Sequence, residues 1–366
     1  DHRRTGHGED AMPVNMSRRR RTAMAVIATG IIATGAGPAA AATPPTRPQP
    51  GLVWAPPQDV DTTGGTIDAV SCATASFCVA VDSKGNAVLD HRGTWSAPVP
   101  VAEGTLTAVS CASVHFCMAV GTASTSTSTG PLTVVYDRGT WTTTTSPVAG
   151  LSETLAGVSC VTGTTFCMAV GQFWFGGPGP STLAQVFDGH TWTVLAGAEM
   201  TGYATGDYLS AVSCPGLISC VTGGTIGNRN DFGDLIETDT NGSWVSSKIS
   251  DGATIGLAGG LAAVDCTGTD SCLAAGPGGY VSRFAQGQWS SPTDVDGASA
   301  ITALSCPTAA ICRAADTSGN VLTASKGSWG TPQAVDPGNS LSTLTCPRRN
   351  FCVAADTAGN VVVGSR

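Results

Sequence analysis

The chain has 366 residues, including 47 glycines and 21 prolines, and only 12% of its residues are charged. Valine, threonine and serine are abundant, a composition that favours strands and tight turns over helices. After residue 42 the chain holds 23 acidic residues against 12 basic ones, which excludes the clustered positive charge that nucleic-acid binding needs.

The first 42 residues divide into a polar leader over residues 1–15 and an expected export signal over residues 16–42. In the signal, four consecutive arginines precede a modest apolar run and a small-residue stretch that suits signal-peptidase cleavage. Both the general secretory route and the twin-arginine route remain open. The apolar run is short and interrupted by glycine, so we expect only transient membrane contact. Residues 43–51 are rich in proline and predict an extended linker.

One unit recurs seven times, most clearly over residues 67–99. A complete unit has two short apolar runs with a cysteine pair where they meet, a glycine-containing turn, a third run, and a tryptophan that opens a fourth. Successive first cysteines lie 39 to 54 residues apart, a period typical of radially repeated four-stranded sheets. The sequence therefore predicts an all-β fold over residues 52–366, a seven-bladed β-propeller with four-stranded blades.

The last unit lacks a tryptophan run, whereas residues 52–60 match such a run without a complete unit before them. We expect residues 52–60 to supply the fourth strand of blade 7. Closure of this kind joins the ring by hydrogen bonds and removes an exposed sheet edge. It also places the first run of each unit next to the central axis, and Trp54 alongside residues 360–364.

All fourteen cysteines fall in the seven pairs. Two cysteines on adjacent strands of one hairpin can form a disulfide without moving the backbone, and disulfides persist outside the cytoplasm. Spacing alone does not fix connectivity, and zinc is the other common use of paired cysteines. Pairing within each unit is the more economical hypothesis. We expect no metal and no cofactor, and one disulfide per blade: Cys72–Cys78, Cys111–Cys117, Cys160–Cys167, Cys214–Cys220, Cys266–Cys272, Cys306–Cys312 and Cys346–Cys352.

The turns between the second and third runs read DSKGN, DTSGN and DTAGN in units 1, 6 and 7. They predict hairpin turns in which glycine adopts a positive φ. Calcium binding is the alternative, and it is disfavoured because each turn offers only one carboxylate.

Units 2, 3 and 4 are longer than the others. From the second cysteine to the tryptophan they span 24, 25 and 24 residues, against 17 in units 1, 5 and 6. We expect the extra residues in long loops on one face of the disc. Aromatic side chains beside Asp and Arg there would suit stacking on a sugar or gripping a peptide, unless they fold over their own loops. The candidate binding residues are Phe173, Trp174, Phe175, Tyr203, Asp207, Tyr208, Arg229, Asp231, Phe232 and Asp234.

Two residues depart from the repeat near its cysteines. Asp265 replaces the Ser or Thr that precedes the first cysteine elsewhere, and Arg313 replaces an apolar residue after the second cysteine. They lie in units 5 and 6, so we expect them near one another in the channel as a structural ion pair.

The run from the third to the fourth strand carries a further pattern, in which Asp90, Asp137 and Asp188 each precede a Thr-Trp pair by three or four residues. This pattern resembles, in degenerate form, the Asp-box (BNR-type) propellers, which include sialidases and noncatalytic binding domains. The repeated SC…FCVAV unit is also similar to secreted repeat proteins of high-GC Gram-positive bacteria. In the sialidase branch the resemblance would imply three arginines and a Tyr activated by a Glu, and no motif brings such residues together.

These observations favour an exported, noncatalytic binding or scaffold propeller, located outside the cell or on its surface. We expect it to be a monomer that recognises a glycan or a protein through the long loops of blades 2–4. The alternative is a sialidase-like glycoside hydrolase or lyase that uses Asp207, Asp231 or Glu237 on the same face. A purely structural envelope protein is a third hypothesis. The sequence contains no GxSxG, HExxH, GxGxxG or P-loop motif.

Overall fold

The computed structural model describes residues 51–124, 129–148, 150–174, 176, 179–195, 206–228, 231–240, 243–251 and 260–366. The predicted leader, export signal and nearly all of the proline-rich linker lie outside the described residues. Pro50–Arg366 form one compact unit.

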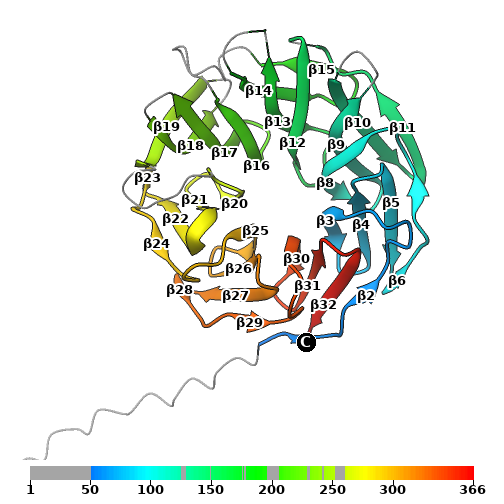
Figure 1. The fold of residues 1–366 in the computed structure, drawn as a ribbon, viewed down its shortest axis with the longest axis vertical. Helices are drawn as coiled ribbons and strands as arrows, with labels where there is room; N and C mark the ends of the chain where they lie inside the picture. The colour runs from blue at the N-terminus through cyan, green and yellow to red at the C-terminus, as the bar shows by residue number, and fades with distance from the viewer. Residues whose placement is uncertain are drawn as a thin grey trace, which may run out of the picture. The chain divides into compact units, whose positions relative to one another are not determined.

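Seven antiparallel sheets surround a central axis (Figure 1). Blades 1 to 3 consist of β3 (Ile67–Thr74), β4 (Phe77–Asp82), β5 (Asn86–His91), β6 (Thr94–Trp95) and β7 (Val99–Pro100); β8 (Thr105–Ser113), β9 (Phe116–Ser124), β10 (Thr129–Asp137) and β11 (Thr140–Thr144); and β12 (Ser152–Cys160), β13 (Cys167–Trp174), β14 (Ser181–Phe187) and β15 (Trp192–Val194). The predicted all-β propeller of seven four-stranded blades is confirmed.

The remaining blades follow the same strand order, and one short 3₁₀ turn, η1 (Pro277–Gly279), interrupts blade 5. Blades 4 to 7 consist of β16 (Tyr208–Gly216), β17 (Ser219–Asn228), β18 (Asp231–Thr240) and β19 (Ser243–Asp251); β20 (Ala263–Gly268), β21 (Ser271–Ala275), β22 (Tyr280–Ala285), β23 (Gln288–Trp289) and β24 (Thr293–Asp294); β25 (Ile301–Thr308), β26 (Ile311–Asp316), β27 (Asn320–Ser325), β28 (Ser328–Trp329) and β29 (Gln333–Ala334); and β30 (Leu341–Arg348), β31 (Phe351–Asp356), β32 (Asn360–Ser365), β1 (Val53–Trp54) and β2 (Gln58–Asp59).

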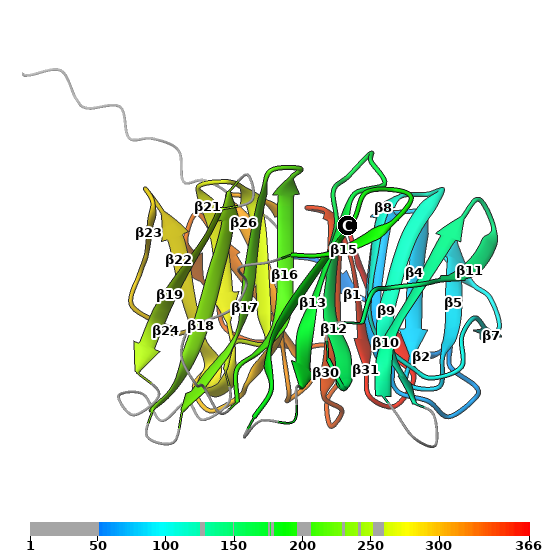
Figure 2. The same cartoon turned by 90° about the horizontal axis from the view of Figure 1, so that it is seen from above.

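The first strand of each blade lies nearest the axis, as the sequence predicted. Each first strand packs against the first strands of both neighbouring blades, so that β3 contacts β8 on one side and β30 on the other. The strands run across the thickness of the disc (Figure 2). Second strands are enclosed between neighbouring sheets, and every residue of β4 is buried. Alternate side chains of such a strand therefore pack against different blades.

The ring closes between its two ends. β1 and β2 both pair with β32 in antiparallel register, with Trp54 opposite Gly364 and Asp59 opposite Asn360. Figure 1 shows the blue β2 beside the red β32. The predicted closing strand is confirmed, and its break into two short pieces matches β6 and β7 in blade 1.

All seven predicted disulfides are present, each within one blade. They link the first two strands of each sheet, next to the hairpin that joins these two strands. In blade 2, Cys111 lies directly opposite Cys117 in the strand register. Intra-blade pairing thus needs no backbone displacement, in agreement with the prediction.

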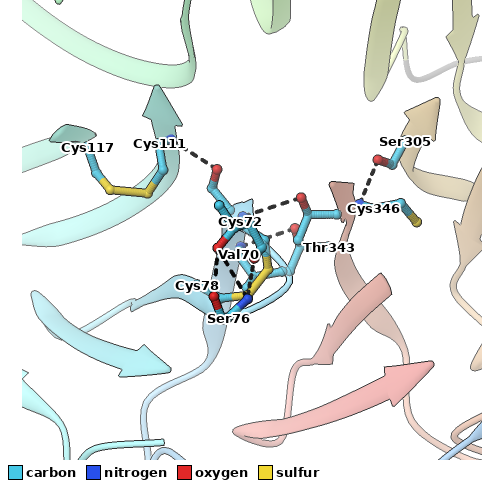
Figure 3. The surroundings of a disulfide bond; sticks show 12 residues. Val70, Cys72, Ser76, Cys78, Cys111, Cys117, Ser305, Thr343 and Cys346 are labelled. Atoms are coloured by element: carbon cyan, nitrogen blue, oxygen red, sulfur yellow. Dashed lines mark hydrogen bonds between the residues drawn. A yellow bond between two sulfur atoms is a disulfide. The ribbon is translucent and has the colours of Figure 1, made fainter. Parts of the chain in front are cut away.

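Hydrogen bonds at the first cysteines join neighbouring blades. The residue before the first cysteine of one blade accepts a hydrogen bond from the backbone N–H of the first cysteine of the next. Ser71 Oγ accepts from Cys111 N at 3.0 Å. The other six acceptors are Ser110, Ser159, Ser213, Asp265, Ser305 and Thr345. Figure 3 shows the equivalent bond from Cys346 N to Ser305 Oγ, at 2.8 Å. Seven hydrogen bonds therefore circle the axis, which explains why each unit carries a short polar residue at this place.

The turns after the second strands are held by their aspartates. Asp82 Oδ1 accepts from the backbone N–H groups of Lys84 and Asn86 at 2.9 and 2.7 Å, and Oδ2 accepts from the Asn86 side chain at 2.6 Å. Gly85 has the expected positive φ of 80°. Asp316 and Asp356 make the same three bonds. The carboxylates thus organise hairpin turns, as predicted.

Candidate functional site

The long blades differ from the expectation in one respect. In blades 2 and 4 the extra residues extend the second and third strands instead of forming loops. β17 and β18 have 10 residues each, against 6 in β4 and in β5, and their ladder continues to the pair Asn228–Asp231. Pairing satisfies the backbone hydrogen bonds of the added residues, which an open loop would leave to water. Blades 2 and 4 therefore present protruding hairpins on this face of the disc.

Two of the candidate binding residues lie at the end of β13. Successive side chains of a strand point to opposite faces, and this alternation separates them. Phe173 is buried in the core between blades 2 and 3. Trp174 is 47% exposed. Phe173 thus belongs to the fold, whereas Trp174 is placed where a partner can reach it.

The candidates in blade 4 are mostly enclosed. Asp207 is buried, and its Oδ1 accepts a hydrogen bond from Gly227 N at 2.8 Å. Burial raises the pKa of the Asp207 carboxyl above its ordinary value, although the Gly227 bond lowers it. Tyr208 begins β16 and is half-buried, and Asp234 is buried in β18.

The structure does not describe the side chains of the remaining candidates. Phe175, Tyr203 and Arg229 lie outside the described residues, as do the side chains of Asp231 and Phe232. Convergence of the whole set therefore stays a prediction.

Glu237 is one of the carboxylates that the hydrolase alternative would use. Its side chain is fully buried in the middle of β18, and Oε1 accepts a hydrogen bond from Ser246 Oγ at 3.1 Å. Burial raises its pKa to about 7, opposed by the Ser246 bond and assisted by the negative charge of Asp207. A proton donor for hydrolysis must touch its substrate. Glu237 and Asp207 are instead enclosed within the fold.

Two exposed apolar side chains lie together at the end of β13, on the long-hairpin face. Leu151 is 73% exposed, beside Trp174. The backbone N–H of Leu151 donates to the carbonyl of Trp174 at 2.7 Å, so the link between blades 2 and 3 is fastened to the end of β13. We call Leu151 and Trp174 the blade 3 patch. Contiguous exposed apolar groups are typical of interaction sites.

A cavity of about 270 Å³ opens between blades 5 and 6. It lies at the disulfide end of the two blades, away from the long-hairpin face. Its walls are largely apolar, with Leu273 and Val281 from blade 5 and Ala324 and Trp329 from blade 6. The polar residues are Asp265, Thr267, Ser271, Arg283, Ser290 and Thr293. The cavity was not predicted from the sequence, although Ala324 stands where units 2, 3 and 5 carry an aromatic residue.

Asp265 and Arg313, expected as an ion pair, have different partners. Asp265 accepts hydrogen bonds from Cys306 N and from Ser213 Oγ. Burial raises its pKa to about 6, against the lowering effect of its hydrogen bonds. Arg313 donates through Nη2 to the carbonyl of Arg349 at 2.8 Å, across the next interface. The expectation fails because both positions face the following blade, so that Asp265 meets blade 6 whereas Arg313 meets blade 7.

In the described part of the chain, no group of three or more His, Cys, Asp or Glu side chains is arranged to hold a metal ion. Over the same residues, no helix has the length and apolar character that crossing a bilayer requires.

Comparison with known proteins places the chain by fold. No protein-family model and no curated protein sequence matches it. Among solved structures, YCF48 bound to D1 peptide has a TM-score of 0.60 at 12% identity, covering 89% of this chain and 99% of that one. Virginiamycin B lyase from Staphylococcus aureus has a TM-score of 0.64 at 10% identity, covering 86% and 99%. The RRP9 WD40 repeats have a TM-score of 0.58 at 10% identity, covering 84% and 99%. The chain thus has the fold of β-propellers.

Proposed function

We propose that this protein is a noncatalytic binding propeller that engages a protein segment through the long hairpins of blades 2–4. The blade 3 patch is the observation that carries the proposal, because two large apolar side chains are exposed next to one another there. A peptide is favoured over a glycan because the patch is apolar, and because the structurally similar YCF48 is bound to a peptide. The degenerate Asp-box resemblance is consistent with a noncatalytic member of that group.

The disulfides support a proposal about the cellular location. Seven disulfides suit an oxidising compartment. We propose that the protein is exported and works outside the cell or at its surface, as a monomer whose rigid ring presents the patch.

The test compares binding profiles on a peptide array and a glycan array. Trp174→Ala combined with Leu151→Ser should abolish peptide binding and leave the melting temperature within about 2 °C, because both side chains are exposed. Ile218→Ala is the matched control, since Ile218 is 62% exposed on the hairpin between β16 and β17. An unchanged peptide profile for the double variant would reject this site. Binding to glycans alone would support the glycan alternative.

A further inference from the structure

The cavity between blades 5 and 6 has an origin in the repeat. At each blade interface two positions at the disulfide end face the gap. One is the residue before the second cysteine. The other is the third-strand residue opposite the second cysteine of the following blade. Between blades 1 and 2 they are Phe77 and Tyr136, whose rings lie 5.8 Å apart.

Between blades 5 and 6 both positions are small, Ser271 and Ala324. Each of the other six interfaces has a large apolar side chain in at least one position: Phe77 with Tyr136, Phe116 with Phe187, Phe166, Phe284, Ile311 and Phe351. The tryptophans of three blades have aromatic neighbours, Tyr136–Trp141, Phe187–Trp192 and Phe284–Trp289, with centroids 5.1 to 5.3 Å apart. In blade 6 the residue opposite Trp329 is Ala324. The missing side chains leave the cavity.

The charges around the cavity are separated along its depth. Asp265 is half-buried at its inner end, where Cys306 N and Ser213 Oγ already donate to it. Arg283 is exposed on β22, and its Nη1 lies 3.2 Å from the point where a Cβ of Gly327 would stand. The guanidinium therefore rests against the β27–β28 turn at the mouth of the cavity. Lys326 precedes Gly327 in the same turn. Of the charged residues that line the cavity, Arg283 is at the mouth and Asp265 is at the inner end.

We propose that this cavity is a second binding site, for a carboxylate joined to an aromatic or branched apolar group. The apolar group would fill the space beside Leu273, Ala324 and Trp329, and the carboxylate would remain at the mouth against Arg283. A charge-assisted bond of this kind is stronger than a neutral one. The reverse orientation is disfavoured because it would bring the ligand's carboxylate to Asp265. The volume of about 270 Å³ is just below that of drug-sized pockets, and it suits one ring with a short chain.

Such a group has two sources, a free aromatic acid or the C-terminal residue of a peptide. The probes are 3-phenylpropionate, its neutral amide, and N-acetyl-Gly-Gly-Phe with a free or an amidated C-terminus. Binding is measured by calorimetry and by the indole N–H signal of Trp329, assigned with Trp329→Phe. We expect a free carboxylate to bind about 5-fold or more tightly than the matching amide. A preference within the phenylpropionate pair identifies a free aromatic acid as the ligand. A preference within the peptide pair identifies the C-terminal residue of a peptide.

Three variants test the geometry. Ala324→Phe restores the aromatic residue of the other blades, and it should abolish binding and raise the melting temperature. Arg283→Gln leaves the cavity intact, and it should remove the preference for the carboxylate while amide binding is retained. Phe284→Ala is the control, because it opens the equivalent space between blades 4 and 5 and should leave probe binding unchanged.

Each opposite result overturns the proposal. These results are equal binding of acid and amide to the parent, binding that survives Ala324→Phe in a folded protein, or no binding of any probe at its solubility limit. Trp174→Ala should bind these probes normally, so failure of the blade 3 patch and failure of this site are distinguishable.

Discussion

Trp54 lies directly opposite Gly364 in the strand register, and a Cβ at Gly364 would stand 2.9 Å from three atoms of the indole ring. Carbon atoms in ordinary contact are about 3.5–4.0 Å apart. The closing tryptophan therefore packs on bare backbone. The same position holds Tyr136, Phe187 or Phe284 in blades 2, 3 and 5. Gly364 leaves room for the Trp54 ring against the backbone, in a sheet that joins segments more than 300 residues apart in the chain.

Gly364→Val should destabilise the ring closure by about 1–3 kcal/mol, because the new side chain must displace the Trp54 ring. Denaturant unfolding measures the change. Gly268→Val is the control, since no atom lies within 4 Å of its added Cβ. Trp54→Ala in the Gly364→Val background should be less damaging than in the parent. Additive losses would contradict the contact.

Ser110→Ala should cost about 1–2 kcal/mol of unfolding free energy, because it leaves the enclosed Cys160 N–H without its acceptor. Faster hydrogen exchange at the Cys160 amide is the accompanying signature. Ser96→Ala is the control: Ser96 also accepts a backbone N–H, at an exposed site where water can replace it. Equal losses for the two variants would argue against a stabilising circle of hydrogen bonds.

Asp265→Ser should stabilise the protein at pH 7.5 and have little effect at pH 4. Burial raises the Asp265 pKa from 3.8 to about 6, so the folded state holds its proton where the unfolded chain has lost it. The stability from this group is present below pH 4 and is lost as the pH rises through 6. The shift corresponds to about 3 kcal/mol. Serine retains the bond to Cys306 N, as in the neighbouring blades. Unfolding at both pH values checks the prediction, and an equal gain at each would contradict it.

Replacing Cys111 and Cys117 together by alanine should lower the unfolding free energy by about 2 kcal/mol, the entropy of closing a short loop in the unfolded chain. Both sulfurs pack within the blades, and Cys117 is fully buried. We therefore expect the folded parent to resist reductant until it is partly unfolded. The gap between variant and parent should narrow when both unfold in reductant. A gap independent of reductant would assign the loss to packing alone.

The repeat made the fold predictable. Seven cysteine pairs set the number of blades, the tryptophan run over residues 52–60 indicated its own partner strand, and the disulfides followed from adjacency in a hairpin. These features are local or periodic, so the same pattern indicates the same structure in each of the seven units. The position of Asp265 was also visible as a departure, but its partner was not, because the hydrogen bond crosses to the next blade.

The candidate sites were harder to predict from the sequence. Phe173 and Trp174 are adjacent aromatic residues, and only the register of β13 decides that one is core and the other surface. The cavity depends on Ser271 and Ala324, two residues 53 positions apart that meet because neighbouring blades stack. By itself the sequence determined the architecture, since hydrophobic period and covalent pairing act within a unit. Tertiary structure alone decided which side chains remain exposed and where space is left, since both depend on packing between units.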